Sequence, residues 1–193
     1  QFKPELPFSP GMEGAGIVAA LGEGVTGLKV GDRVVAGLRI GGFAEAANVP
    51  EAACRPIPGT MDFAKAAAYP AAYLTAYVAL VRRGHLQKGE TLLVHGSTGG
   101  VGLAAVEMGK LLGATVIATS ASDEKLKVVK QRGADHVINV NDGFREKVKE
   151  LTDDRGADVI YDPVGGDVFD ESVRCIAWNG RLLIIGFTSG RIP

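Results

Sequence analysis

The stretch Leu92-Leu93-Val94-His95-Gly96-Ser97-Thr98-Gly99-Gly100-Val101-Gly102 decides the fold. It begins as an unbroken apolar run, passes through a glycine-rich turn and continues into residues 101–112, whose apolar positions follow a helical period. An apolar run without polar alternation is typical of a strand buried on both faces of a parallel sheet. The stretch therefore predicts a β-strand, a tight loop and a helix in immediate succession.

The same alternation continues downstream. Apolar runs begin at residues 92, 116, 136, 159 and 182, so their starts lie 20 to 24 residues apart. Amphipathic stretches fill the intervals, at residues 101–112, 123–132, 144–152 and 168–178. Five such repeats predict an α/β fold built on a doubly wound, parallel Rossmann sheet of five strands.

The sequence before residue 75 has a different texture. Short apolar runs, such as residues 16–20 and 33–36, are separated by glycine pairs and turn residues. This pattern predicts an irregular antiparallel β unit, with loosely ordered loop as the alternative. We expect a helix at residues 75–88 and two domains, 1–74 and 75–193. Tyr69, Tyr73 and Tyr77 are four residues apart, which we interpret as a stripe facing a core.

Composition excludes several function classes. Hydrophobic residues make up 46% of the chain and charged residues 22%, and the net charge is -1, so a packed core is expected and a nucleic-acid partner is not indicated. No apolar run is long enough for a membrane span. Cys54 and Cys175 are far apart, which favours two buried thiols in a reducing compartment over a disulfide framework. We therefore expect a cytoplasmic protein.

The glycine-rich loop at residues 96–102 predicts a dinucleotide site. Glycines let the backbone turn tightly and approach a pyrophosphate, while the start of the following helix offers unpaired N–H groups and the positive end of its dipole. The spacing is Gly-x-x-Gly-x-x-Gly, and its place between a strand and a helix gives the motif its specificity. A structural turn, or a site for another nucleotide-like ligand such as a methyl donor, is the alternative.

The end of the second predicted strand distinguishes NADPH from NADH. It reads Ala118-Thr119-Ser120-Ala121-Ser122, without the acid that would hold the free ribose hydroxyls of NADH. Ser122 and Lys125 can offer a hydroxyl and a cation to a 2′-phosphate, so we expect NADPH. Alternatively, Ser122 is only a helix cap and Lys125 a solvated side chain, and Asp123 or Glu124 turns toward the ribose.

These motifs together resemble the medium-chain dehydrogenases and reductases. Gly11-Met12-Glu13-Gly14-Ala15-Gly16 and Gly31-Asp32-Arg33-Val34 resemble their catalytic domain. The loop at residues 96–102, Tyr161-Asp162-Pro163-Val164-Gly165-Gly166 and the pairs at 180–181 and 186–187 resemble their cofactor domain. The glycine loop and Ser122-Asp123-Glu124-Lys125 resemble the NADPH:quinone oxidoreductase branch. The resemblance implies a partial GroES-like domain at residues 1–74 and a Rossmann domain at 75–193 that lacks its last strand.

Two departures from that family pattern shape the expectation. Zinc-dependent members have a histidine where this chain has Met12, and a cysteine cluster; here His85, His95 and His136 are scattered, so we expect no metal site. The family is also longer than 193 residues, and residues 1–10 read as a cut within a chain, so we interpret this sequence as a piece of a longer protein.

The resemblance implies hydride transfer from NADPH to a quinone or an α,β-unsaturated carbonyl, without zinc. An enoyl-thioester reductase, or a cofactor-binding protein without a catalytic role, is the alternative. The resemblance places Thr75 near the nicotinamide, Val164 along the nicotinamide end, and Phe187 at the start of a closing loop. Together with residues of the glycine loop and of the segment after the second predicted strand, they form the predicted cofactor-binding set: Thr75, Ser97, Thr98, Gly99, Gly100, Val101, Ser120, Ser122, Lys125, Val164 and Phe187. No catalytic residue is assigned; we expect a homodimer in the longer protein and weak or absent turnover by this piece.

Overall fold

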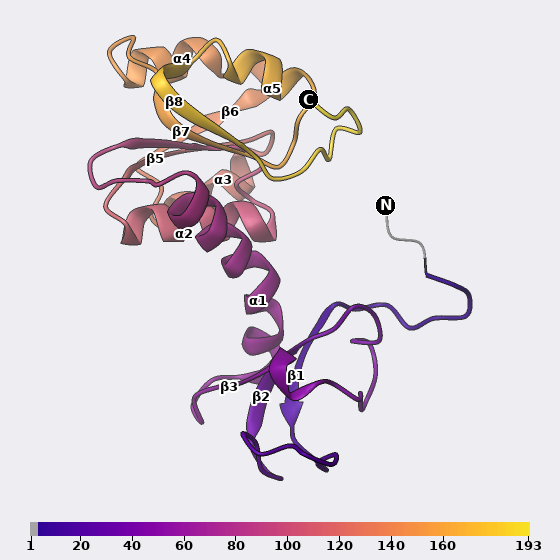
Figure 1. Ribbon diagram of the computed structural model, residues 1–193. Coiled ribbons are helices and arrows are strands. Elements are labelled where there is room, and N and C mark those ends of the chain that lie inside the picture. The colour runs from indigo at the N-terminus through magenta and orange to yellow at the C-terminus, as the bar shows by residue number, and fades with distance from the viewer. Residues whose placement is uncertain (1–3) are drawn as a thin grey trace. The chain divides into compact units, whose positions relative to one another are not determined.

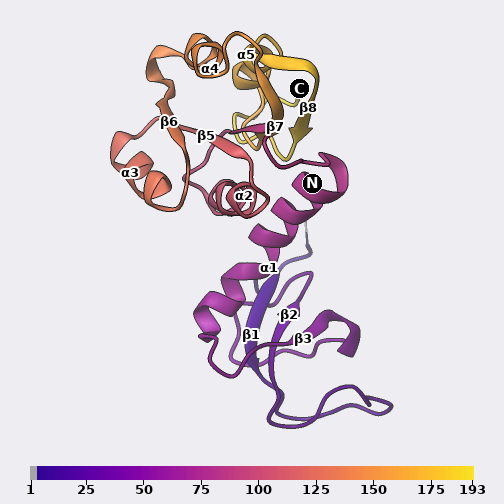
Figure 2. The same cartoon turned by 90° about the vertical axis from the view of Figure 1, so that its left-hand side faces the viewer.

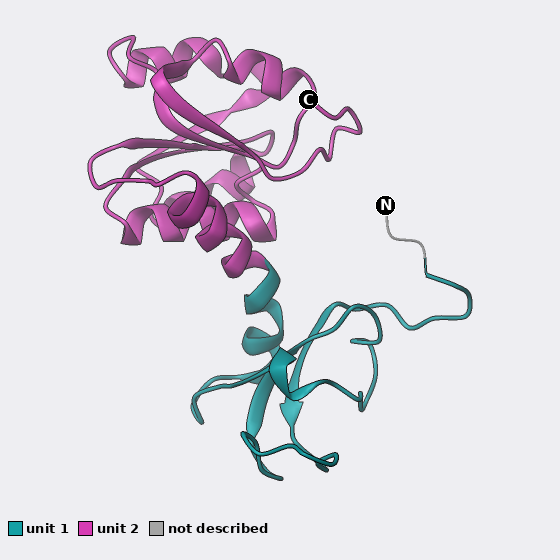
Figure 3. Ribbon diagram, in the orientation of Figure 1, with its two compact units in different colours: residues 1–71 teal, residues 72–193 magenta. Residues whose placement is uncertain are grey.

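The structure, a computed structural model, describes residues 4–193; residues 1–3, the beginning of the segment interpreted as a cut, lie outside the described residues. The chain divides into two compact units, residues 1–71 and residues 72–193 (Figure 3). Each unit is described in turn.

The first unit contains a small antiparallel sheet. Its strands are β1 (Glu13–Ile17), β2 (Arg33–Gly37) and β3 (Cys54–Pro56), hydrogen-bonded in the order β1-β2-β3, and the short 3-10 turn η1 (Glu51–Ala53) precedes β3. Along β2, Val34 and Ala36 are buried while their neighbours are less so, which is the alternation of a strand with one covered face. Gly11 and Gly42 approach so closely that a Cβ on Gly11 would lie 2.8 Å from the Cα of Gly42. The predicted irregular β unit is thus confirmed.

The second unit is built on a parallel sheet of five strands in the order β6-β5-β4-β7-β8. The strands are β4 (Thr91–Val94), β5 (Thr115–Ser120), β6 (His136–Asn139), β7 (Ala157–Asp162) and β8 (Ile176–Ile184). All four neighbouring pairs are parallel. The strand order reverses between β4 and β7, and this reversal marks the point at which doubly wound sheets bind ligands beyond their carboxyl ends. The predicted fold class is confirmed.

Helices cover both faces of this sheet (Figure 1, Figure 2). The helices α2 (Gly100–Leu111) and α3 (Asp123–Gln131) lie on one face, and α4 (Arg145–Leu151) and α5 (Asp167–Ser172) on the other; the 3-10 turn η3 (Val140–Asp142) precedes α4. Two buried clusters follow from this layering. Leu92, Val94 and Val116 belong to the first, and Leu93, Ile117 and Ile160 to the second, because successive strand residues point to opposite faces.

Two predicted helices have different bounds in the structure. The helix expected at residues 75–88 begins earlier, as α1 (Phe63–Tyr77), and continues as the π-helical turn η2 (Val78–Arg83). Pro70 lies inside α1, and the amide of the next residue, Ala71, donates a hydrogen bond of 2.8 Å to the Glu13 carboxylate. The helix expected at 168–178 ends at Ser172, because Ile176 already pairs with Ala157 in the sheet.

The proposed tyrosine stripe of α1 is not a buried one. Tyr69 is 49% exposed and Tyr77 is 44% exposed, so the prediction that they face a core is wrong. Tyr73 is partly buried and donates a hydrogen bond to the Glu107 carboxylate. Of the two cysteines, both free thiols, Cys175 is buried as expected and Cys54 is only partly buried.

Candidate cofactor site

The glycine loop leaves the carboxyl end of β4 and enters α2 within a few residues. Gly96 has a φ of 53°, which is the left-handed region that favours glycine. A Cβ on Gly102 would lie 2.3 Å from the Gly96 carbonyl oxygen and 2.8 Å from the Cα of Ser97. The first and last glycines of the loop are therefore required by the backbone itself, since the helix begins in direct contact with the turn.

Gly100 is in a different situation. A Cβ built on it would meet nothing within 4 Å, so open space faces the first residue of α2. The first hydrogen bond along this helix is the one of 2.9 Å from the Leu103 amide to the Gly99 carbonyl oxygen, so the amides of residues 100–102 precede it. Free amides, a positive dipole end and open space are what an anionic pyrophosphate needs. The loop thus fits the group that its sequence predicts.

The side chains of Ser97 and Thr98, which follow Gly96 in the loop, have different hydrogen-bond partners. Ser97 is fully buried, and its amide and its hydroxyl both donate to the Thr119 carbonyl oxygen, at 3.1 and 2.9 Å. Both donors of Ser97 therefore hold the loop against the end of β5. The Thr98 hydroxyl lies 3.4 Å from the Ser120 hydroxyl, so these two predicted residues are neighbours on the cofactor edge.

Ser122 caps α3, as the alternative interpretation holds. Its hydroxyl oxygen accepts a hydrogen bond from the Lys125 amide at 3.4 Å, and its own amide donates to the Ser120 hydroxyl. The Lys125 side chain is exposed. Asp123 accepts a hydrogen bond of 2.8 Å from the Asn139 side chain, so this carboxylate is turned toward the end of β6.

The loop after β7 gathers the remaining predicted residues. The Asp162 carboxylate accepts hydrogen bonds from the amides of Val164, at 2.8 Å, and Gly165, at 3.0 Å, which fixes the turn. A Cβ on Gly165 would lie 3.2 Å from that of Phe187, so the Val164 and Phe187 segments are in close contact. Thr75 is half-buried and lies in the last turn of α1.

Two buried side chains at the end of β7 belong to the motif that resembles the cofactor domain, but neither was assigned a role from the sequence. Asp162 is the acid that closes the strand before Pro163, and its position at a strand end was the available signal. The second is Tyr161, which is fully buried and whose hydroxyl has no hydrogen-bond partner within residues 4–193. Burial raises the pKa of Tyr161 to about 12, so this phenol stays neutral and is not suited to giving up a proton.

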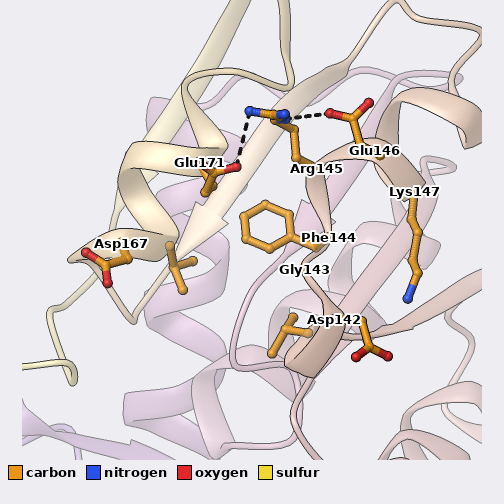
Figure 4. Close-up of a pocket in the computed structure, with 10 residues that line it drawn as sticks. Asp142, Gly143, Phe144, Arg145, Glu146, Lys147, Asp167 and Glu171 are labelled. Atoms are coloured by element: carbon orange, nitrogen blue, oxygen red, sulfur yellow. Dashed lines mark hydrogen bonds and ion pairs between the residues drawn. The ribbon is translucent and has the colours of Figure 1, made fainter.

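A cavity of about 450 Å³ opens on the α4 and α5 side of the same edge (Figure 4). Phe144 lies at its centre in the close-up, and Val140 and Val168 add apolar surface. Arg145 is engaged with Glu146 at 2.7 Å and with Glu171 at 3.5 Å. The charged residues that line the cavity are Asp142, Arg145, Glu146, Lys147, Asp167 and Glu171. Because acids outnumber bases here, the cavity suits an uncharged ring better than a phosphate.

Two absences hold for the part of the chain that the structure describes. Between residues 4 and 193, no group of three His, Cys, Asp or Glu side chains is placed to hold a metal ion. Met12, at the position of a zinc-binding histidine in the resemblance, is 70% exposed. Likewise, no helix within these residues has the length and apolar character needed to cross a bilayer.

Known proteins match both units. Residues 1–59 match the family model of the alcohol dehydrogenase GroES-like domain, and residues 100–193 match that of the zinc-binding dehydrogenases. A quinone oxidoreductase-like protein 2 homolog from Nematostella vectensis is 46% identical over 197 residues, which cover 100% of this chain and 53% of that protein. The chain spans about half the length of the curated relatives it matches.

Solved structures agree with these matches. The quinone oxidoreductase of Escherichia coli, solved in complex with NADPH, superposes with a TM-score of 0.92 at 35% identity, covering 99% of this chain and 59% of that one. The enoyl reductase CurK superposes with a TM-score of 0.85 at 32% identity, covering 91% of this chain and 53% of that one. Both units and their order along the chain are shared with these proteins, and this chain belongs to the quinone oxidoreductase branch of the medium-chain dehydrogenases and reductases.

Proposed function

We propose that the protein carrying this chain is an oxidoreductase that transfers a hydride from NADPH to a quinone or an α,β-unsaturated carbonyl, without zinc. The observation that carries the proposal is the open start of α2, where the amides of residues 100–102 precede the first hydrogen bond of the helix and Gly100 faces free space. Relatives named quinone oxidoreductases, one of them solved with NADPH, support the same assignment.

The dinucleotide is proposed to lie along the carboxyl edge of the second unit. The amides of Gly100 and Val101 would hold the pyrophosphate, with the Thr98 and Ser120 hydroxyls beside it. The Gly99 amide, also predicted for this role, instead donates to the Gly96 carbonyl oxygen at 3.0 Å and closes the turn. Ser122 and Lys125 would hold the 2′-phosphate, and the turning of Asp123 toward Asn139 removes one competing carboxylate from that place. The uncharged adenine would lie against Phe144 and the apolar wall of the neighbouring cavity.

At the other end, Val164 would border the nicotinamide, with Thr75 and Phe187 as further proposed contacts. NADPH supplies the hydride; the chain's residues bind, orient and exclude water. Val164 is held for this task because Asp162 binds the amides of the turn, so the strand end and the turn form one rigid piece. Ser97 contributes by holding the loop against β5, since its own donors are occupied there.

An enoyl-thioester reductase is the second candidate, and the superposition with CurK favours it specifically. The decisive experiment follows the loss of NADPH absorbance with matched panels of quinones, enals and enoyl thioesters. It uses the 193-residue chain and the longer protein that we expect to contain it. Faster turnover of quinones or simple enals supports the proposal. A preference for enoyl thioesters selects the second candidate, and NADPH binding without turnover of any panel by the longer protein selects a non-catalytic role.

The expected location is the cytoplasm and the expected assembly is a homodimer of the longer protein. Support for both is general: two free cysteines suit a reducing compartment, and β8 has a neighbouring strand on one side only within the described residues. Fractionation and light scattering of the longer protein test them.

A further inference from the structure

His95 is the first residue after β4, and its side chain is almost completely buried, at 1% exposed. Its Nδ1 lies 2.9 Å from the hydroxyl oxygen of Thr119 in β5, and its Nε2 lies 2.9 Å from that of Ser172 in α5. The ring also meets the Phe144 ring edge-on, with 4.6 Å between centroids. A single imidazole therefore joins the ends of β4 and β5 to both helices of one face.

The hydrogen bonds fix which nitrogen carries the proton. The Ser172 hydroxyl donates its only proton to the Val168 carbonyl oxygen, at 2.6 Å, so toward His95 it can only accept. Nε2 must then carry the hydrogen, so Nδ1 can only accept. The Thr119 hydroxyl donates to Nδ1 at 2.9 Å in preference to the Val94 carbonyl oxygen, which lies farther from it, at 3.4 Å. Burial lowers the pKa of His95 to about 3, so the ring is neutral near pH 7 and this arrangement holds.

The hydrogen bonds at Nδ1 and Nε2, called here the Thr119 arm and the Ser172 arm, each lead to one half of the proposed cofactor edge. Thr119, held by Nδ1, presents the carbonyl oxygen that receives both donors of Ser97 in the glycine loop. Ser172, held by Nε2, lies in α5, which begins directly after the turn that contains Val164. The two arms therefore support the phosphate end and the nicotinamide end separately.

We propose that His95 is a positioning residue with two separable effects on the bound dinucleotide. The bond from Thr119 to Nδ1 holds the glycine loop and so sets the affinity for NADPH. The bond from Nε2 to Ser172 holds α5 and the Val164 turn and so sets the placement of the nicotinamide ring. This inference rests on the proposed function, because it assigns the two ends of the edge to the two ends of NADPH.

Four variants separate the two arms. Thr119→Val and His95→Gln remove the Thr119 arm, because the Gln amide can replace only the distant Nε2 donor. Ser172→Ala and His95→Asn remove the Ser172 arm, because the Asn oxygen can replace only the near Nδ1 acceptor. For each we would measure the Kd of NADPH by fluorescence titration, the emission spectrum and lifetime of the bound nicotinamide, and the unfolding temperature.

The first pair should weaken NADPH about tenfold, the size expected for a lost buried hydrogen bond, and leave the emission of the bound cofactor unchanged. The second pair should keep the Kd within about twofold and alter the emission and lifetime. A merely structural histidine would lower the unfolding temperature in all four variants without this division, and that result overturns the inference.

Nitrogen NMR of the wild-type chain reports the tautomer of His95 directly, so this test does not depend on whether any variant folds. With three histidines in the sequence, labelled imidazoles can be resolved, and His95 should show an Nε2–H tautomer that does not titrate between about pH 5 and 8. An Nδ1–H tautomer, or a titrating ring, overturns the inference. Absence of NADPH binding by the longer protein refutes the proposed function and this inference with it, whereas tight binding with four indistinguishable variants refutes the inference alone.

Discussion

Replacing Gly100 by Asp should abolish NADPH binding while leaving the fold intact. A side chain at this position meets nothing within 4 Å, so the structure itself does not oppose it. An acid in the first turn of α2 also stabilises the helix by about 0.3–1 kcal/mol, because it faces the positive end of the dipole. The unfolding temperature of Gly100→Asp should therefore equal or slightly exceed that of the wild type.

The loss of affinity follows from the same location. The new carboxylate would compete for the amides of residues 100–102 and repel the pyrophosphate. Two charge-assisted hydrogen bonds are together worth about 3 kcal/mol or more, and like charges about 4 Å apart add roughly 4 kcal/mol at an effective dielectric constant near 20. Because about 1.4 kcal/mol corresponds to tenfold, the Kd of NADPH should rise at least about 100-fold.

Fluorescence titration with NADPH and thermal unfolding followed by circular dichroism test this together. Gly100→Ala is the matched control, since it adds the Cβ without the charge and should weaken binding far less. Gly102→Ala is the opposite control: its Cβ would lie 2.3 Å from the Gly96 carbonyl oxygen, so it should destabilise the fold. If folded Gly100→Asp binds NADPH within about threefold of the wild type, the loop is a structural turn and the assignment is refuted.

Four further predictions use other parts of the chain. Lys125→Ala should reduce the preference for NADPH over NADH by about 1–3 kcal/mol, measured by titration with both cofactors; equal wild-type affinities would refute the assignment. Elemental analysis should find no stoichiometric zinc, and turnover by the longer protein should survive a chelator, whereas zinc bound at Cys54 or Cys175 would contradict the branch assignment. The contribution of His95 to the free energy of unfolding should be full above about pH 6.5 and fall toward pH 3 by up to about 1.4 kcal/mol per pH unit, because the unfolded chain protonates this histidine first. Denaturant titrations at several pH values should show that the free energy of unfolding of His95→Gln depends less steeply on pH. The 193-residue chain should self-associate through β8, whose Ile184 is 53% exposed, and Ile184→Lys should reduce this in light scattering; a wild-type chain that is monomeric at high concentration contradicts it.

The sequence predicted the sheet because unalternating runs such as Leu92-Leu93-Val94 have a single stable environment, between two layers of helices. Helix ends were harder to place. Residues 168–178 keep a helical pattern after Ser172, but Ile176 pairs with Ala157, and that choice depends on a partner distant in the sequence. Similarly, the tyrosine spacing in α1 fits a buried stripe, yet burial depends on what the helix packs against.

In the candidate site too, features set by local backbone geometry were predictable from the sequence, and features set by distant partners were not. Glycine spacing predicted where the backbone turns, because a left-handed φ at Gly96 and the close contact at Gly102 are local requirements. The direction of the Ser97 side chain was not predictable, since a serine in a loop can bind a ligand or the chain itself with equal chemistry. In the sequence, His95 is an isolated histidine, because its partners Thr119 and Ser172 lie 24 and 77 residues away and carry no motif.

In the proposed function, the second unit would recognise NADPH mainly through backbone amides and the geometry of a strand end, and this has a consequence for substrate choice. Amides at a helix start would bind the pyrophosphate whatever the second substrate is, so the proposed edge would suit a quinone reductase and an enoyl reductase equally well. The chain accordingly superposes on solved structures of both kinds with similar TM-scores, 0.92 and 0.85. Discrimination between a quinone and an enoyl thioester must therefore come from side chains outside the dinucleotide edge. Variants of Gly100, Ser122 or Lys125 should then change the affinity for the cofactor while leaving the order of preference among hydride acceptors unchanged.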